Sequence, residues 1–356
     1  MARFRSAQLT ALLGMAWAAS GLPRPAMAES AREPTGVATA ASRWEFVEPH
    51  MGTLFRIVIF APEVTAAKSA AKAAFARVAA LNRVMSDYDP DSELMRLCRQ
   101  PAGTPVKISP ELCDILHRSQ RLSETSEGAF DVTLGPVIRL WREARRQKKL
   151  PAEESRKAAL LASGYRKLRL DLEGQTVTLL AAGMQLDLGG IAKGYAADAA
   201  LTVLARHGFR RAMVEASGDI ALGEPPPESD GWKVQLAPFG SDPAGSILVT
   251  AANAGISTSG DAEQFLELGG VRYSHIVDPA TGLGLTRPVA VTVVARHATL
   301  SDGLATACSV LSPAAVKPMI EKLNEPVRIL VQTRNRNGAV QRRSFGTNPP
   351  GVSFPL

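Results

Sequence analysis

Asp302 and Thr306 are the two residues whose types and spacing point most directly to metal chemistry. They lie four residues apart, so on a helix both side-chain oxygens project from one face. A carboxylate and a hydroxyl are hard ligands that suit Mg2+, with further ligands supplied by carbonyls, waters or phosphates. The alternative is structural, with Asp302 capping a helix start and Thr306 bonding back to its own helix. The residues alone favour neither interpretation.

A glycine turn at Gly189 and Gly190 is the second feature with chemical meaning. It joins an apolar segment ending near Asp187 to a predicted helix over residues 191–207. Glycines let a backbone approach a ligand closely, and the free N–H groups of a helix start can bind phosphate. The spacing matches neither a P-loop nor a dinucleotide-binding fingerprint. A tight turn before an ordinary amphipathic helix explains the same residues equally well.

A small-residue turn over residues 126–133 contains Ala129, Phe130 and Asp131. Such a turn could line a nucleotide pocket, with its backbone and Asp131 hydrogen-bonding to base or ribose. The structural alternative makes Phe130 a core residue and Asp131 a cap for the next element. By itself the turn favours the structural interpretation.

His275 is the histidine with the most polar surroundings, because it sits at the end of a predicted strand, within the polar segment 273–282 that continues segment 258–261. An imidazole there could act as a general base near neutral pH. A histidine that only satisfies its own turn, beside Asp278 and Pro279, fits equally well.

The order and spacing of these segments resemble the ApbE family of FAD:protein FMN transferases over residues 51–311. The resemblance rests on residues 51–53, 85–94, 128–131, 187–198, 258–261, 273–282 and 302–307. It implies that a Thr or Ser hydroxyl of an acceptor protein attacks the FMN-side phosphorus of FAD, which releases AMP and leaves a phosphoester-linked flavin. Positioning and charge neutralisation dominate such phosphoryl transfers. A metal-dependent FAD pyrophosphatase and a non-catalytic FAD-binding protein are the alternatives.

The resemblance also implies roles for individual residues. Asp302 and Thr306, with the carbonyl of Ala192, would hold Mg2+, and His275 would accept the proton of the acceptor hydroxyl. Gly189 and Gly190 would reach the phosphates. The remaining expected FAD contacts are Met51, Tyr88 as a stacking partner, Ala129, Phe130, Asp131, Asp187, Lys193, Tyr195 and Ile276. The expected partner is the acceptor flavoprotein subunit of a redox complex, with a Ser/Thr-Gly-Ala-Thr/Ser segment.

The chain departs from the family pattern at a few positions. Ala216-Ser217-Gly218-Asp219 stands where two glycines are common before the acid or amide, and Gly303 stands where alanine is more usual. Glycine inside a helix costs up to about 1 kcal/mol relative to alanine. The expected metal ligands are unchanged.

The elements that must position these residues alternate irregularly between helices and strands, which predicts an α+β fold with largely antiparallel sheets packed with helices. The resemblance further implies a T-fold-related architecture. Helices are predicted over residues 62–86, 110–123, 191–207, 302–311 and 313–323, with a basic linker over 142–149. Strands are predicted over residues 55–60, 168–172, 176–180, 184–188, 212–215, 232–237, 247–251, 271–276, 289–295, 327–332 and 340–344.

The N-terminus has the pattern of a signal peptide over residues 1–28, with early arginines, an apolar run over 7–19 and a small-x-small site ending at Ala28. The protein is therefore expected to be exported to the periplasm, without an integral membrane span. A lead-in over 29–43, a transferase domain over 44–346 and a tail over 347–356 would follow.

Composition limits the class of protein. The chain of 356 residues is 46% hydrophobic, enough for a sizeable core. Its formal net charge is +7, and removing the three arginines of the leader leaves 38 basic and 34 acidic residues, a net charge of +4. That excess gives no reason to expect a nucleic-acid partner. The cysteines, Cys98, Cys113 and Cys308, could be buried thiols or include one disulfide.

Overall fold

The computed structural model describes residues 41–236, 246–260, 265–334 and 339–355. The predicted signal peptide over 1–28, most of the predicted lead-in over 29–43, and Asp261 lie outside these residues. Folded structure begins with β1 at Ser42, two residues before the predicted start of the domain.

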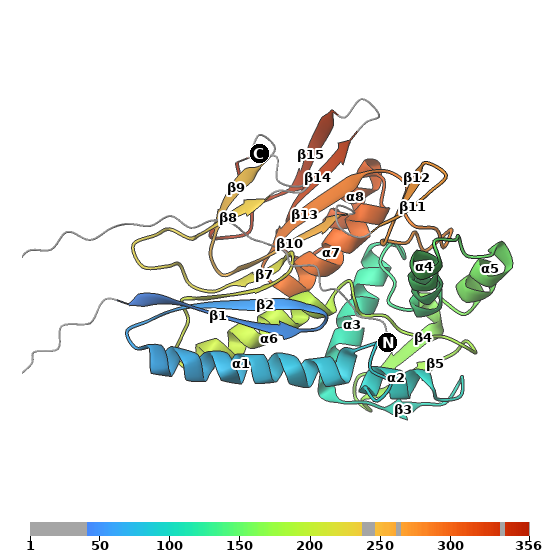
Figure 1. Ribbon diagram of the computed structural model, residues 1–356, viewed down its shortest axis with the longest axis horizontal. Helices are drawn as coiled ribbons and strands as arrows, with labels where there is room; N and C mark the ends of the chain where they lie inside the picture. The colour runs from blue at the N-terminus through green and yellow to red at the C-terminus, as the bar shows by residue number, and fades with distance from the viewer. Residues whose placement is uncertain (1–40, 237–245, 261–264, 335–338, 356) are drawn as a thin grey trace, which may run out of the picture. The chain divides into compact units, whose positions relative to one another are not determined.

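An antiparallel sheet of eight strands, in the order β1-β2-β6-β7-β10-β13-β14-β15, is the centre of the fold (Figure 1). Taken in that order, the strands span Ser42–His50, Thr53–Ala61, Ala212–Ala216, Asp219–Leu222, Ala254–Gly260, Val289–Ala295, Arg328–Arg334 and Val340–Gly346. Alternate residues of β2 serve two cores: Phe55, Ile57 and Ile59 point into the main core, and Val58 points into the core on the opposite face. The predicted α+β class with largely antiparallel sheets is confirmed.

Three helices cover one face of this sheet: α1 (Val64–Met85), α6 (Ala192–Arg206) and α7 (Ala298–Val310). Figure 1 shows α1 and α6 running beside each other under β1 and β2, and these two helices are in contact. The buried face of α1 is largely alanine, which lets the helix pack close to its neighbours. These helices carry or border most of the candidate functional residues.

A small sheet covers part of the opposite face. It contains β16 (Val352–Ser353), β9 (Ile247–Ala251) and β8 (Trp232–Leu236), in that order. Its apolar side chains form the second core with Val58, Met213 and Leu222 of the large sheet. The segment 347–356, predicted as a tail, contributes β16 and the buried Phe354 to this layer.

A third apolar cluster joins α4 (Gly135–Gln147) and α5 (Glu153–Leu161) to the hairpin of β11 (Phe265–Leu268) and β12 (Val271–Ser274). From α4 this cluster takes Val137, Trp141 and Ala144, which share one helical face. The prediction of a basic linker over residues 142–149 was therefore wrong, because most of this segment is the last part of α4. The polar residues suggested a linker, but one buried face is enough to stabilise a helix against a partner.

Shorter elements complete the fold. They are α2 (Glu93–Cys98), α3 (Pro110–Thr125), α8 (Pro313–Glu321), a 3-10 turn at Tyr165–Lys167 and a sheet of β3 (Val106–Lys107), β5 (Thr176–Leu179) and β4 (Leu168–Asp171). In the part of the chain described, no helix is both long and apolar enough to cross a membrane.

Two further predicted elements need correction. Residues 184–188 form no strand beyond a bridge between Gln185 and Leu134, because their alternating apolar residues are buried by a loop contact instead of a sheet partner. The helix α7 begins at Ala298, four residues before the predicted start at Asp302. Its first N–H groups, on Ala298 and Thr299, donate to the carboxylate of Asp198, a cap that comes from α6 and cannot be read locally.

Candidate active site

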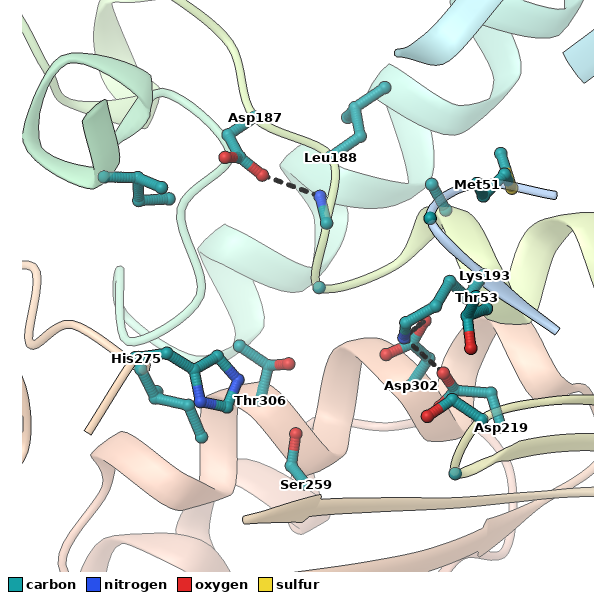
Figure 2. Close-up of a pocket in the computed structure, with 18 of the residues that line it drawn as sticks. Met51, Thr53, Asp187, Leu188, Lys193, Asp219, Ser259, His275, Asp302 and Thr306 are labelled. Atoms are coloured by element: carbon teal, nitrogen blue, oxygen red, sulfur yellow. Dashed lines mark hydrogen bonds and ion pairs between the residues drawn. The ribbon is translucent and has the colours of Figure 1, made fainter. Parts of the chain in front are cut away.

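A cleft of about 1320 Å³ lies where the large sheet, the start of α6, α7 and the loop after α1 meet. It brings together every residue predicted to act on FAD or metal except one. The lining includes Met51, Tyr88, Ala129, Phe130, Asp131, Asp187, Gly189, Gly190, Ala192, Lys193, His275, Ile276, Asp302 and Thr306. Figure 2 shows several of these side chains converging from separate elements. Residues 255 positions apart in the chain, such as Met51 and Thr306, therefore share one site.

Tyr195 is the exception, because it does not line the cleft. It is half-buried beside Asp114 of α3, and burial together with that carboxylate raises the pKa of its phenol to about 12. Its position gives no support to the predicted contact with FAD.

The deepest charged group is a set of three residues, Lys193, Asp219 and Asp302, which we call the deep cluster. The ammonium of Lys193 pairs with Asp219 and lies 3.8 Å from Oδ2 of Asp302. Both carboxylates are only 3% exposed. Burial, reinforced by the charge of Asp219, raises the pKa of Asp302 to about 7. Burial alone would lower the pKa of Lys193, but the two carboxylates raise it.

Asp302 does not have the capping role that the structural alternative gave it. It lies in the second turn of α7 and accepts a 3.0 Å hydrogen bond at Oδ2 from the backbone N–H of Gly194. Its other oxygen, Oδ1, has no hydrogen-bond partner among the described residues, and neither has the hydroxyl of Thr306 one turn later. Both residues line the cleft. Two oxygen donors are therefore open to a ligand in the cleft.

The glycines at the start of α6 are required by close packing. A Cβ on Gly190 would lie 3.0 Å from Oγ1 of Thr306, and a Cβ on Gly194 would lie 2.2 Å from the carbonyl oxygen of Ala298. A side chain at position 194 would force α6 and α7 apart, and one at position 190 would press on the hydroxyl of Thr306. The glycines thus hold the backbone around Ala192 against the residues of α7 that carry the open oxygens.

A second charged group lies at the rim of the cleft and contains Asp87, Tyr88, Arg142 and Asp187; we call it the rim cluster. The guanidinium of Arg142 pairs with Asp87, and its Nη2 lies 2.6 Å from Oδ2 of Asp187. It also lies 4.2 Å from the centre of the Tyr88 ring. Sequence reasoning missed Arg142. The apolar stripe of α4 could have pointed to it, because a helix over 135–147 places Arg142 beside the buried face and not in a linker.

The predicted contact loop at residues 129–131 has a structural role as well as a place in the lining. Phe130 is 3% exposed and packs in the main core. Asp131 accepts hydrogen bonds from the backbone and hydroxyl of Thr133, and from the backbone of Tyr165. Both side chains are thus committed to the fold, and the loop is left with its backbone to offer a ligand.

His275 follows β12 and is half-buried in the lining, next to the buried Ile276. The hydroxyl of Ser274 accepts a hydrogen bond from the N–H of Ile276 and so fixes the turn that presents the imidazole. In the view of Figure 2, His275, Thr306 and Ser259 lie on one side, and the deep cluster lies on the other. A substrate between them would lie beside an imidazole on one side and two buried carboxylates on the other.

The donors available suit a hard cation. Within the described residues, no group of three or more His, Cys, Asp or Glu side chains could hold a metal ion by itself. The open Oδ1 of Asp302 and Oγ1 of Thr306 are oxygen donors of the kind Mg2+ prefers, and a site with so few protein ligands suits an ion shared with phosphate oxygens. Cys98, Cys113 and Cys308 are all free thiols.

Of two departures from the family pattern, one carries a conformational cost and the other has a visible cause. Ser217 adopts a φ of 59° in the turn between β6 and β7, a conformation that costs a serine more than a glycine. A Cβ on Gly303 would lie 2.4 Å from Cδ2 of Leu122, so the glycine makes room for a leucine of α3.

Comparison with known proteins gives one consistent result. Residues 51–331 match the model of the ApbE family. The chain is 32% identical to the FAD:protein FMN transferase of Vibrio cholerae, covering 80% of this chain and 86% of that protein. It is 34% identical to the FAD:protein FMN transferase of Treponema pallidum, covering 76% and 78%. The solved structure of the flavin transferase ApbE from Vibrio cholerae superposes with a TM-score of 0.76 at 29% identity, covering 86% of this chain and 98% of that one.

Proposed function

The chain belongs to the ApbE family, a family of enzymes, and on this premise we propose that it transfers the FMN moiety of FAD to a Thr or Ser hydroxyl of an acceptor protein. The single observation that carries the proposal is the pair of open oxygens, Asp302 Oδ1 and Thr306 Oγ1, beside the glycine turn in one cleft. This is an arrangement that suits a metal-bound pyrophosphate.

In the proposed reaction, the acceptor hydroxyl oxygen bonds to the FMN-side phosphorus as the bond from that phosphorus to the bridging oxygen breaks. AMP leaves with the bridging oxygen, and the hydroxyl proton passes to His275. A Mg2+ ion held by Asp302, Thr306 and the carbonyl of Ala192 would neutralise charge on the pyrophosphate. The protein mainly orients the reactants, which is the expected form of catalysis for phosphoryl transfer.

The other residues of the cleft would hold FAD in place. The exposed ring of Tyr88 offers a stacking surface for the isoalloxazine, and the backbone of the glycine turn offers close approach to the phosphates. Lys193 would keep two buried carboxylates compatible with a nearby anion, because its charge offsets one of theirs.

We further propose that the protein works outside the cytoplasm, on a flavoprotein subunit of a redox complex that carries a Ser/Thr-Gly-Ala-Thr/Ser segment. The support is the signal-peptide pattern of residues 1–28 together with the family's reaction. Fractionation of cells that express the full chain should find it in the periplasm, with the first 28 residues removed.

The test of the reaction is direct. Residues 29–356, FAD, Mg2+ and a purified acceptor domain should give acceptor with one FMN attached by mass spectrometry and an equal amount of AMP. Asp302→Asn should lower the transfer rate at least about 100-fold, since it removes charge stabilisation at the reacting phosphate. The exposed Asp230→Asn is the matched control and should transfer as the wild type does.

Three outcomes would contradict the proposal. The first is the absence of transfer to each of several acceptor domains, and the second is full activity of Asp302→Asn. The third is rapid release of FMN and AMP from FAD without acceptor, at a rate that an added acceptor does not change, which would identify a pyrophosphatase.

A further inference from the structure

Arg142 connects three segments that are far apart in the sequence. It lies on α4, and its two terminal nitrogens pair with Asp87, in the loop after α1, and with Asp187, in the loop before α6. A guanidinium is a rigid fork that can hold two carboxylates at a fixed separation, which the single point charge of a lysine cannot do. The three segments are therefore fixed relative to one another at the rim of the cleft.

One side of this connection leads to Tyr88. The ring of Tyr88 is 75% exposed, an unusual position for an aromatic, and it lines the cleft. Its contact with the guanidinium, at 4.2 Å from the ring centre, is supported by the neighbouring pair of Arg142 with Asp87. Arg142 thus orients a ring that little else holds.

The other side leads to the glycine turn. Oδ1 of Asp187 accepts a 2.8 Å hydrogen bond from the N–H of Gly189, while Oδ2 is held by Arg142. The next residue, Gly190, packs against Thr306 of α7. An unbroken series of contacts therefore runs from Tyr88 through Arg142 and Asp187 to the turn beside Thr306.

We propose that Arg142 is a positioning residue that sets the distance and orientation between the Tyr88 ring and the Gly189–Gly190 turn, so that both ends of one flavin dinucleotide fit the cleft together. This inference rests on the proposed function, in which Tyr88 stacks on the isoalloxazine and the turn faces the pyrophosphate. Arg142 acts through Asp187 and Tyr88, and its effect should appear only in ligands long enough to contact both.

Riboflavin and FAD distinguish this role from a general loss of structure. Riboflavin carries the isoalloxazine ring without phosphate, and FAD spans both contacts. Arg142→Met, titrated by flavin fluorescence, should weaken FAD binding about tenfold or more, as expected when a hydrogen-bonded charge is removed. Riboflavin affinity should change less than about threefold, because riboflavin can follow the Tyr88 ring without having to fit the Gly189–Gly190 turn at the same time. Arg142→Lys should restore only part of the FAD affinity.

A matched control lies on the same helix. Arg139 is exposed, one turn before Arg142, and makes no ion pair with any described residue. Arg139→Met should bind both ligands as the wild type does. In transfer assays at saturating FAD, Arg142→Met should also lower kcat, because a misplaced pyrophosphate reacts slowly even when it is bound.

The outcomes separate this inference from the proposed function. Equal losses of FAD and riboflavin affinity in Arg142→Met, an unchanged FAD affinity, or full rescue by lysine would each overturn the positioning role while leaving wild-type transfer as it was. A wild-type protein that binds FAD but transfers no FMN would overturn the proposed function alone. A wild-type protein that binds no FAD would overturn both.

Discussion

The deep cluster and the rim cluster are built from the same parts but leave different atoms open. Each sets one cation against two carboxylates at the cleft. In the deep cluster, Oδ1 of Asp302 has no partner among the described residues. In the rim cluster, Asp187 has both oxygens occupied, one by Arg142 and one by the N–H of Gly189.

This difference suits the deep cluster to ligand binding and the rim cluster to fixing the geometry of the cleft. An open carboxylate oxygen facing a cleft can accept an external cation, because little has to be displaced. A carboxylate with both oxygens bonded gives up a hydrogen bond for any new contact, so it serves better to fix geometry. The open Oδ1 of Asp302, more than the number of charges, therefore distinguishes the deep cluster from the doubly bonded Asp187.

Removing the cation should destabilise the protein more at the deep cluster than at the rim cluster. Lys193→Met leaves Asp219 and Asp302 buried beside each other without a positive charge, and losing one partner of a buried pair costs about 3–5 kcal/mol. Arg142→Met should cost less, about 1–3 kcal/mol, because Asp187 keeps its backbone hydrogen bond. Urea unfolding in the presence of a chelator measures both. A larger loss for Arg142→Met would reverse the comparison.

Asp187 of the rim cluster should make the stability of the protein depend on pH. Burial, with the charge of Asp87, raises the pKa of Asp187 to about 6 against the favourable charge of Arg142. Between its ordinary pKa of 3.8 and about 6, the folded protein therefore binds more protons than the unfolded chain, so this residue's contribution to stability falls as pH rises. The total change is up to about 3 kcal/mol, since each pH unit of that interval is worth about 1.4 kcal/mol.

Asp187→Asn removes this titration and is the natural comparison. Urea unfolding of both proteins at pH 4, 5, 6 and 7 tests this. As pH rises from 4 to about 6, the stability of the wild type should fall relative to that of the variant, and above pH 6 the difference should change little. Two curves that stay parallel from pH 4 to pH 7 would show that Asp187 is ionised throughout and that Arg142 fully compensates its burial.

Much of the deep cluster could be predicted from sequence, because its residues lie in short local patterns. Asp302 and Thr306 share a helical face, and Lys193 lies three residues after Gly190. Asp219, the third member, drew attention in the sequence only as the last residue of the segment 216–219, which departs from the family pattern. Its pairing with Lys193 depends on the hairpin of β6 and β7, which no local spacing shows.

The rim cluster could not be assembled in the same way. Arg142 belongs to a helix whose buried face is satisfied by the β11–β12 hairpin more than 100 residues later, so its polar residues suggested a linker. The start of α7 was placed too late for the same reason, since its cap is Asp198 of α6. Local propensity predicted the long helices and most strands, while contacts distant in sequence decided the boundaries around the cleft.

The smallest predicted effect concerns the packing that supports the deep cluster. Gly303→Ala should raise helix propensity by up to about 1 kcal/mol, yet its Cβ would lie 2.4 Å from Leu122, and overpacking costs about 1–3 kcal/mol. The net expectation is a loss of about 1 kcal/mol in urea unfolding. In a Leu122→Ala background the clash is absent, so the same substitution should stabilise the protein. A loss in both backgrounds would mean that Leu122 is not the reason for the glycine. Because Gly303 follows Asp302, any shift of α7 should weaken FAD binding more than riboflavin binding, through the deep cluster and with the rim cluster intact.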